Sequence, residues 1–117
     1  MGERQVFAGY CLLLPDPVVP HLNALSPAER ELFLGDMGRV GDAVMAVTAA
    51  LRINYAMFGN VEPALHAHIF PRFDDEPVAT RTAHPWAFDW HLAPPWSIGV
   101  HGELKRRIAM QLEDSLL

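Results

Sequence analysis

Two histidines separated by a single residue are the first candidates for chemistry in this 117-residue chain. His66 and His68 lie in the segment ALHAHIFPRF, residues 64–73, which ends on a Pro-Arg pair. In a β-strand, residues two apart share a face, so both imidazoles point the same way and Phe70 follows them. The apolar residues in between point the opposite way. We therefore expect one face of this strand to be core and the other to carry titratable groups.

The pair has two interpretations that involve no covalent chemistry. Alternate histidines on a strand can bind one metal ion, with a third ligand drawn from the histidines of the C-terminal part of the chain, namely His84, His91 and His101. No second cluster with metal-ligand spacing accompanies them. Alternatively, both imidazoles are simply satisfied by backbone groups or solvent on a half-exposed sheet face.

The third interpretation is nucleophilic catalysis. A neutral imidazole attacks phosphorus well and is also a good leaving group near neutral pH. Its second ring nitrogen needs an acceptor that fixes the tautomer, and the phosphate oxygens need hydrogen-bond donors as negative charge develops. A second imidazole on the same face, together with the side-chain amides of Asn54 and Asn60, could supply such donors. No metal is required in this scheme.

The elements that must position these residues indicate an α+β domain. Ser26, Pro27 and Glu29 form a capping-box pattern that predicts the start of a helix, and apolar residues recur at intervals of three and four to about residue 51. Strands are expected at 5–15, 52–58 and 64–71. The last two form a hairpin-like pair, so we expect a sheet that is covered on one face by the long helix.

The composition changes after residue 75. Residues 76–117 are rich in proline and contain all three tryptophans, Trp86, Trp90 and Trp96, which either close over a cleft or bury in an oligomer interface. A short helix is expected at 102–117, with Leu104, Ile108 and Leu112 on one face. We therefore divide the chain into a core, 1–75, and a tail, 76–117, that packs on the core or on a partner subunit.

Composition excludes several classes of partner. The formal net charge is −5, and no basic stripe is present, so polymeric nucleic acid is not expected as a ligand. No segment approaches the roughly 20 apolar residues of a membrane span. The single cysteine, Cys11, is expected to be a buried structural thiol and suits a reducing compartment, so we expect a cytoplasmic protein.

The segment GNVEPALHAHIFPRF resembles the histidine triad (HIT) family, whose motif is three alternating histidines, then two residues and commonly Pro-Arg. Anchoring on the Pro-Arg pair makes His68 the third histidine and His66 the middle one, and it puts Ala64 where the first belongs. Upstream, GYCLLLP, ALSPAERELF and INYAMFGN resemble the family's glycine-led strand, the start of its long helix and its asparagine-bearing strand. The likeness covers residues 8–75.

The resemblance implies a small antiparallel sheet that continues across a homodimer. It also implies a nucleotide-binding hydrolase or transferase acting on dinucleoside polyphosphates, nucleoside phosphoramidates or adenylylated compounds. The family's middle histidine attacks the α-phosphorus and forms a nucleotidyl-histidine, which assigns the catalytic role to His66. The resemblance also implies that His68, Asn54 and Asn60 lie around the phosphate, and it implies no metal or other cofactor.

The chain departs from the family pattern at several positions. Ala64 has no side-chain donor or acceptor, although its carbonyl could still orient the nucleophile. Val61 stands where a Ser or Thr usually contacts phosphate, and losing one such donor typically costs roughly 10²–10³ in rate. Tyr10 replaces a histidine. Few residues precede Gly9, so the base pocket is expected to be trimmed or rebuilt, for example by the tail tryptophans. A non-catalytic nucleotide-binding or assembly module of the same fold is therefore the alternative.

Overall fold

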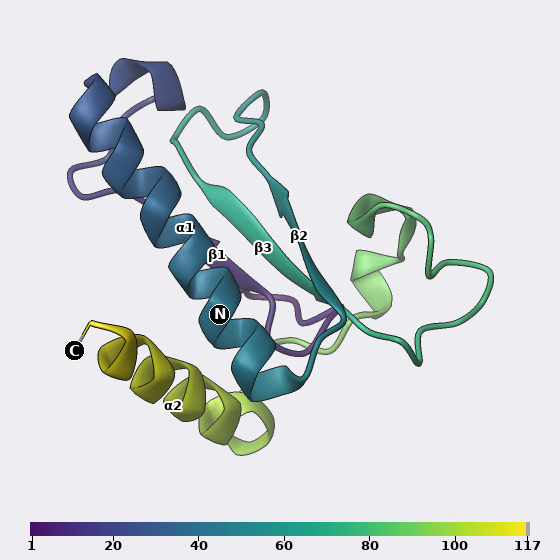
Figure 1. Ribbon diagram of the computed structural model, residues 1–117. Coiled ribbons are helices and arrows are strands. Elements are labelled where there is room, and N and C mark those ends of the chain that lie inside the picture. Colours follow the sequence, from purple (N-terminus) through teal and green to yellow (C-terminus); the bar gives the residue numbers. More distant parts are fainter. Residues whose placement is uncertain (117) are drawn as a thin grey trace.

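The computed structural model describes residues 1–116 and shows an α+β fold with a three-stranded antiparallel sheet in the order β1-β3-β2 (Figure 1). This confirms the expected fold class. The chain order is β1 (Cys11–Leu13), α1 (Pro27–Thr48), β2 (Arg52–Ala56), β3 (Ala67–Arg72) and α2 (Ile98–Ser115). Single-turn 3-10 helices lie at Leu22–Ala24, Pro85–Ala87 and Trp90–Leu92.

Helix α1 begins where the sequence predicts. The Ser26 hydroxyl accepts from the Glu29 backbone N–H, and the Glu29 carboxylate accepts from the Ser26 N–H, so both halves of the capping box are present. The helix ends at Thr48, earlier than the expected residue 51, because Ala49 adopts a left-handed conformation with φ of 58°. Gly41 faces the sheet, where a Cβ would collide with the Tyr55 hydroxyl.

Strand β3 is the centre of the sheet and of the core. Leu65, Ala67 and Ile69 are buried on the side facing α1, as the alternation predicts. The strand itself begins at Ala67 rather than at residue 64, so His66 lies just before it. Phe70, on the histidine side, is also fully buried because other segments cover that part of the face.

The N-terminal segment is not the long strand expected at 5–15, since only Cys11–Leu13 pairs with β3. The preceding residues form a turn organised by Gln5. Its amide nitrogen donates to the carbonyl oxygens of Gly2 and Tyr10, and its amide oxygen accepts from the Gly9 N–H. Gly9 has φ of 102°, which favours glycine. The turn brings Phe7 and Tyr10 onto Phe70.

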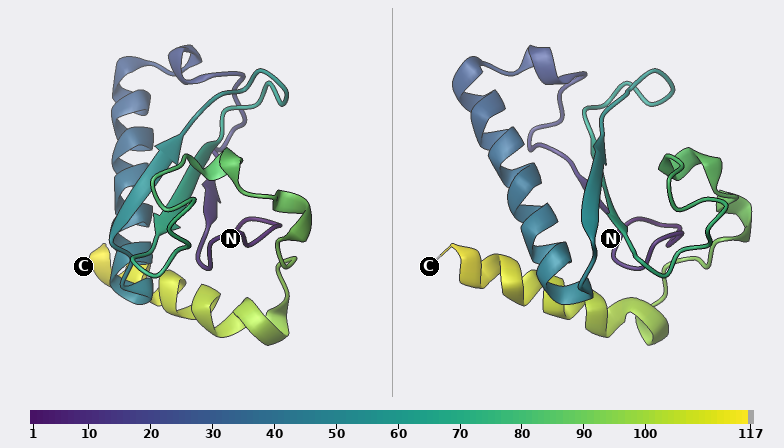
Figure 2. Two further views of the ribbon diagram at one scale, coloured as in Figure 1. Left: turned by 90° about the vertical axis from the view of Figure 1, so that its right-hand side faces the viewer. Right: turned by 45° about the vertical axis from the view of Figure 1, so that its right-hand side comes forward.

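The C-terminal part of the chain lies on two sides of the core (Figure 2). Its irregular first portion lies beside the sheet, on the side opposite α1, whereas α2 runs across one end of α1. Helix α2 begins at Ile98, before the expected residue 102, because Ser97 caps it. Ile108 joins Val44 and Ile69 in one buried cluster. Leu117 lies outside the described residues, and the division of the chain at residue 75 stays a prediction.

None of the helices within residues 1–116 is long and apolar enough to cross a membrane.

Candidate active site

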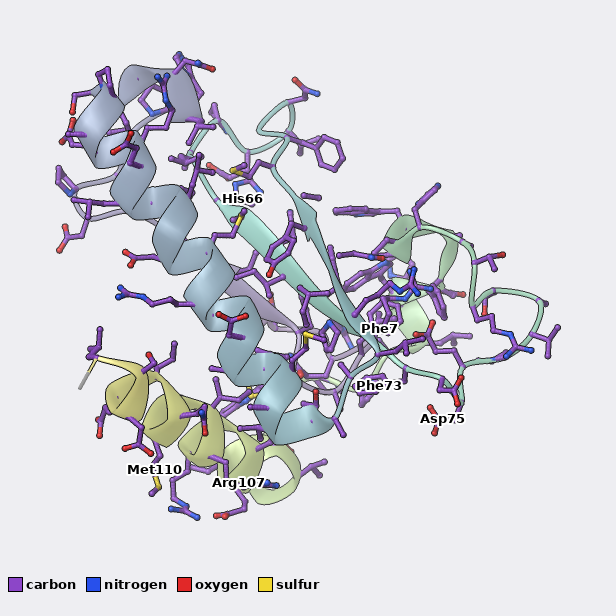
Figure 3. The ribbon with its side chains drawn as sticks, viewed as in Figure 1. Phe7, His66, Phe73, Asp75, Arg107 and Met110 are labelled. Carbon is purple, nitrogen blue, oxygen red and sulfur yellow. The ribbon has the colours of Figure 1, made fainter. Side chains whose placement is uncertain are left out.

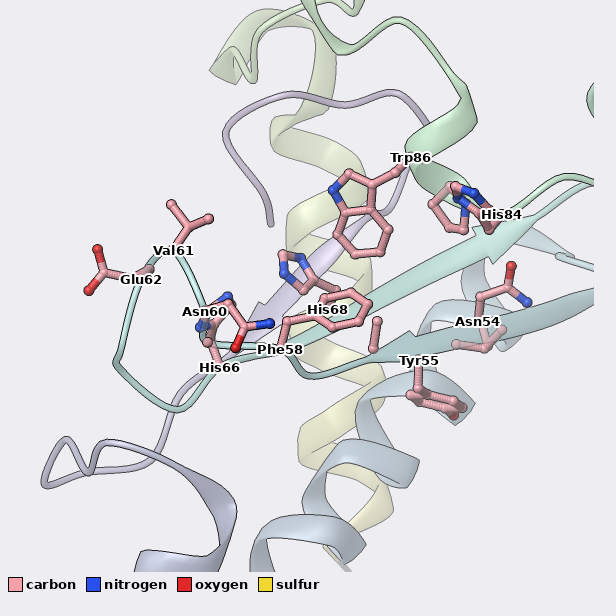
Figure 4. Close-up of a pocket in the computed structure, with 14 residues that line it drawn as sticks. Asn54, Tyr55, Phe58, Asn60, Val61, Glu62, His66, His68, His84 and Trp86 are labelled. Carbon is pink, nitrogen blue, oxygen red and sulfur yellow. The ribbon is translucent and has the colours of Figure 1, made fainter.

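A pocket of about 930 Å³ opens on the histidine face of the sheet (Figure 4). It brings together all four residues that the sequence singled out: His66, His68, Asn54 and Asn60. They come from β2, from β3 with the residue just before it, and from the connection between these strands. The tail contributes His84, Pro85 and Trp86 to the same pocket.

The backbone next to His66 determines which of its ring nitrogens is reactive. Nδ1 lies 2.6 Å from the carbonyl oxygen of Ala64, and a carbonyl oxygen only accepts hydrogen bonds, so Nδ1 carries a proton and donates. In the neutral ring the lone pair is then on Nε2. The Ala64 backbone thus supplies the acceptor that a nucleophilic imidazole requires, without any side-chain contribution.

His68 is held as a neutral ring. Burial, with a smaller contribution from the charge of neighbouring His66, lowers its pKa to about 4. The imidazole rings of the two histidines lie 4.9 Å apart, centroid to centroid, at 75° to each other. At neutral pH His68 therefore acts on a ligand through hydrogen bonding rather than through a positive charge.

Tyr10 is the residue behind His68 that sequence reasoning did not assign to the site. Its hydroxyl lies 2.7 Å from His68 Nδ1, and the phenol is buried. Burial, together with the charge of Cys11, raises the pKa of Tyr10 to about 12, so the phenol keeps its proton and can donate to Nδ1. The ring proton of His68 is then on Nε2, which becomes a donor. The only sequence signal was that Tyr10 follows the glycine of the first strand.

The two amide candidates differ in how firmly they are held. The side-chain oxygen of Asn54 accepts a hydrogen bond of 2.8 Å from Arg72 Nη1, which leaves the amide nitrogen as the group that can donate to a ligand. Asn60 lies exposed in the connection between β2 and β3, after Gly59 with φ of 87°. Val61 is 98% exposed and offers no side-chain donor.

Arg72 is buried and its guanidinium is bound within the protein, so it is not free to bind phosphate. Its guanidinium pairs with the Glu76 carboxylate at 2.9 Å, and both side chains are 7% exposed. It also donates to carbonyl oxygens of the tail, those of Thr80, Arg81 and Ala83. Arg72 therefore ties the tail to the end of β3.

The tail tryptophans have three different environments. Trp86 meets His68 edge to face with ring centroids 5.1 Å apart, inside the pocket. Trp90 packs against Tyr10 and Phe70 beneath the site. Trp96 lies apart from both, next to the Lys105 ammonium. Two of the three thus cover the histidine face, and no periodicity in the sequence distinguished them from the third.

The metal hypothesis lacks a ligand set among residues 1–116. No group of three His, Cys, Asp or Glu side chains within them is arranged to hold an ion. His84 lines the pocket, but His91 is exposed in a 3-10 helix, and His101 accepts a hydrogen bond from the Ser97 N–H at the start of α2. The pocket instead offers imidazole and amide donors, which suits an anionic ligand.

Comparison with solved structures identifies the fold. The chain is similar to a histidine triad protein from Sinorhizobium meliloti, with a TM-score of 0.74 and 23% identity over 87% of this chain and 73% of that one. Similar values hold for histidine triad proteins from Marinobacter aquaeolei (0.75, 19%, 90% and 74%) and Bradyrhizobium japonicum (0.73, 19%, 88% and 75%). No family model and no curated protein matches the chain.

These similarities confirm the HIT-like fold that the motif predicts. They cover 87–90% of the chain, more than residues 1–75 alone could supply, so the structural likeness extends into the tail.

Proposed function

We propose that this HIT-like protein is a nucleotide-binding hydrolase or transferase that cleaves nucleoside phosphoanhydrides or phosphoramidates, including diadenosine polyphosphates, through a nucleotidyl-histidine at His66. The observation that carries the proposal is the 2.6 Å contact between His66 Nδ1 and the Ala64 carbonyl oxygen, which leaves Nε2 as the nucleophilic atom in a pocket large enough for a nucleotide. The fold similarity supports the nucleotide as ligand.

The proposed reaction has two displacements at phosphorus. In the first, the Nε2 lone pair of His66 forms a bond to the α-phosphorus, the P–O or P–N bond to the leaving group breaks, and the leaving group takes a proton from water. In the second, water attacks the phosphorus, the P–N bond to His66 breaks, the electron pair returns to Nε2, and the water proton goes to solvent. The positive charge on the modified ring is stabilised by the Nδ1–H bond to Ala64.

The proposed phosphate contacts are imidazole and amide donors of the pocket. In this proposal the Nε2–H of His68 and the amide groups of Asn54 and Asn60 donate to phosphate oxygens, because preorganised donors stabilise the charge of the transition state. Val61 contributes no donor, and this favours the second candidate function, a nucleotide-binding or assembly module with little or no turnover.

Turnover with a fluorogenic adenosine phosphoramidate and with diadenosine tetraphosphate tests the proposal. His66→Ala is expected to reduce the rate to the buffer background while AMP affinity changes only slightly, and His91→Ala, an exposed histidine outside the pocket, is the matched control. A mass increase of one nucleotidyl group on the wild type, absent in His66→Ala, would identify the intermediate. Equal background from both proteins with AMP still bound would support the binding module, and no AMP binding would refute both functions.

We further propose a cytoplasmic homodimer in which the sheet continues across two copies. Strand β2 forms one edge of the three-stranded sheet, and Tyr55 on that strand is 42% exposed, which supports an intersubunit contact. Light scattering after size-exclusion chromatography tests the dimer, and a monomeric mass at micromolar concentration would refute it.

A further inference from the structure

Two aromatic rings line the pocket that holds the histidines (Figure 4). Phe58, beside Asn60, and Trp86, beside His68, come from two separate segments of the chain. These rings are 67% and 42% exposed, respectively. Exposed large aromatic side chains lining a concave site are typical of a surface that binds a ligand.

The exposure of these two rings contrasts with the other aromatic residues of this face. Phe7, Tyr10 and Phe70 are 3%, 5% and 0% exposed, so they complete a packed core beneath the pocket. Burying exposed apolar area stabilises a complex by roughly 25 cal/mol per Å². Phe58 and Trp86 therefore expose apolar area that a planar ligand would bury, and this burial would stabilise the complex.

The geometry of the two rings forms a corner. Their centroids lie 5.2 Å apart and their planes meet at 73°, so a planar ring placed there would stack on one and meet the other edge to face. The indole of Trp86 also contacts His68, at 5.1 Å between centroids. The corner is therefore separated from the expected phosphate site by a single imidazole ring.

The backbone that carries Trp86 is fixed although its indole is exposed. Pro85 is buried, and its carbonyl oxygen accepts from the indole N–H of Trp90 at 3.1 Å. Two residues earlier, the Ala83 carbonyl oxygen accepts from Arg72 at 2.7 Å. Because the tail is anchored on both sides of His84, a ligand that stacks on Trp86 pays little for ordering the loop.

We propose that Phe58 and Trp86 form the stacking site for the nucleobase of the nucleotide whose phosphate lies at His66, an inference that rests on the function proposed above. The site takes aromatic bases and recognises them by stacking area rather than by a specific hydrogen-bond pattern. It therefore favours purines over pyrimidines and does not separate adenine from guanine. Trp86 from the tail thus supplies one of the two ring contacts to the base.

Calorimetric titration with AMP, GMP, CMP and ribose 5-phosphate tests this site. Base stacking on aromatic side chains is worth about 1–3 kcal/mol, so AMP and GMP should bind about 5- to 150-fold more tightly than ribose 5-phosphate, with CMP in between. Trp86→Leu and Phe58→Leu should each remove much of this difference without changing ribose 5-phosphate binding. Trp86→Phe should retain most of the difference in affinity between AMP and ribose 5-phosphate, and Trp96→Phe should leave it unchanged.

The outcomes separate this inference from the proposed function. If AMP and ribose 5-phosphate bind the wild type equally, or if Trp86→Leu weakens both to the same extent, the stacking site is wrong while the phosphate site stands. If neither compound binds, both are wrong. For the active enzyme, Trp86→Leu should raise KM and leave kcat nearly unchanged, because stacking on the base is the same in the ground and transition states. A loss confined to kcat would also overturn the stacking role.

Discussion

Removal of the Glu76 carboxylate is predicted to be the most damaging single change near the site that leaves the pocket lining intact. In the wild type, Arg72 Nε donates to both Glu76 oxygens at 3.1 Å, and Nη2 donates to one of them at 2.9 Å. Both side chains are 7% exposed. Glu76→Ala would leave a buried guanidinium with only neutral carbonyl and amide oxygens as partners.

The expected magnitude follows from this burial. Breaking a buried ion pair by removing one partner costs about 3–5 kcal/mol, because an uncompensated charge remains out of water. That is a large fraction of the roughly 5–15 kcal/mol by which a domain of this size is stable. The second loss is local, since the Glu76 carboxylate also accepts from the Phe73 N–H at 2.6 Å, which shapes the turn into the tail.

Urea denaturation followed by tryptophan fluorescence measures the effect. With a slope of about 2 kcal/mol per molar urea, the loss corresponds to a midpoint lower by roughly 1.5–2.5 M. Asp75→Ala, an exposed carboxylate one residue away, is the matched control and should change stability by less than about 0.5 kcal/mol. Arg72 anchors the tail that carries Trp86 and Trp90, so native-state fluorescence should change in Glu76→Ala but not in the control.

A double variant isolates the charge. Arg72→Met combined with Glu76→Ala removes both charges, so it should be less destabilised than the sum of the single variants. The reasoning is refuted if Glu76→Ala behaves like Asp75→Ala, or if the two single changes simply add. Either result would mean that the guanidinium is solvated in the folded protein.

Three further predictions concern the site and the long helix. The pKa of His68 is lowered from 6.5 to about 4, so between these values the unfolded chain binds a proton that the folded chain does not. This contribution to the free energy of unfolding is complete above pH 6.5 and should decrease as the pH falls toward 4. His68→Gln should flatten the dependence in urea titrations between about pH 5 and 7. Tyr10→Phe removes a donor that favours the neutral ring, so the pKa of His68 measured by NMR should rise; a decrease would show that the hydroxyl accepts from Nδ1 instead. Ser26→Ala should cost about 1 kcal/mol in the free energy of unfolding, against a negligible change for exposed Thr82→Ala, and an equal effect of both would contradict the role of the cap.

The features that the sequence predicted well are those determined within a few residues along the chain. The capping box of α1 depends on contacts between Ser26 and Glu29, and the burial of Leu65, Ala67 and Ile69 follows from the two-residue period of an extended chain. The spacing of the histidines to Pro71 and Arg72 was sufficient to indicate the HIT-like fold, which the solved structures confirm.

The tertiary structure alone decided how the site is completed. The Tyr10 hydroxyl reaches His68 across 58 positions of the chain, and this contact determines which nitrogen of the ring can donate. Arg72 is buried with Glu76, and the tail residues His84, Pro85 and Trp86 line the pocket. Such contacts depend on how an N-terminal turn and an irregular tail pack on one sheet face. Neither segment has a repeating pattern, so no local rule specifies which of their side chains meet; packing of the whole molecule does.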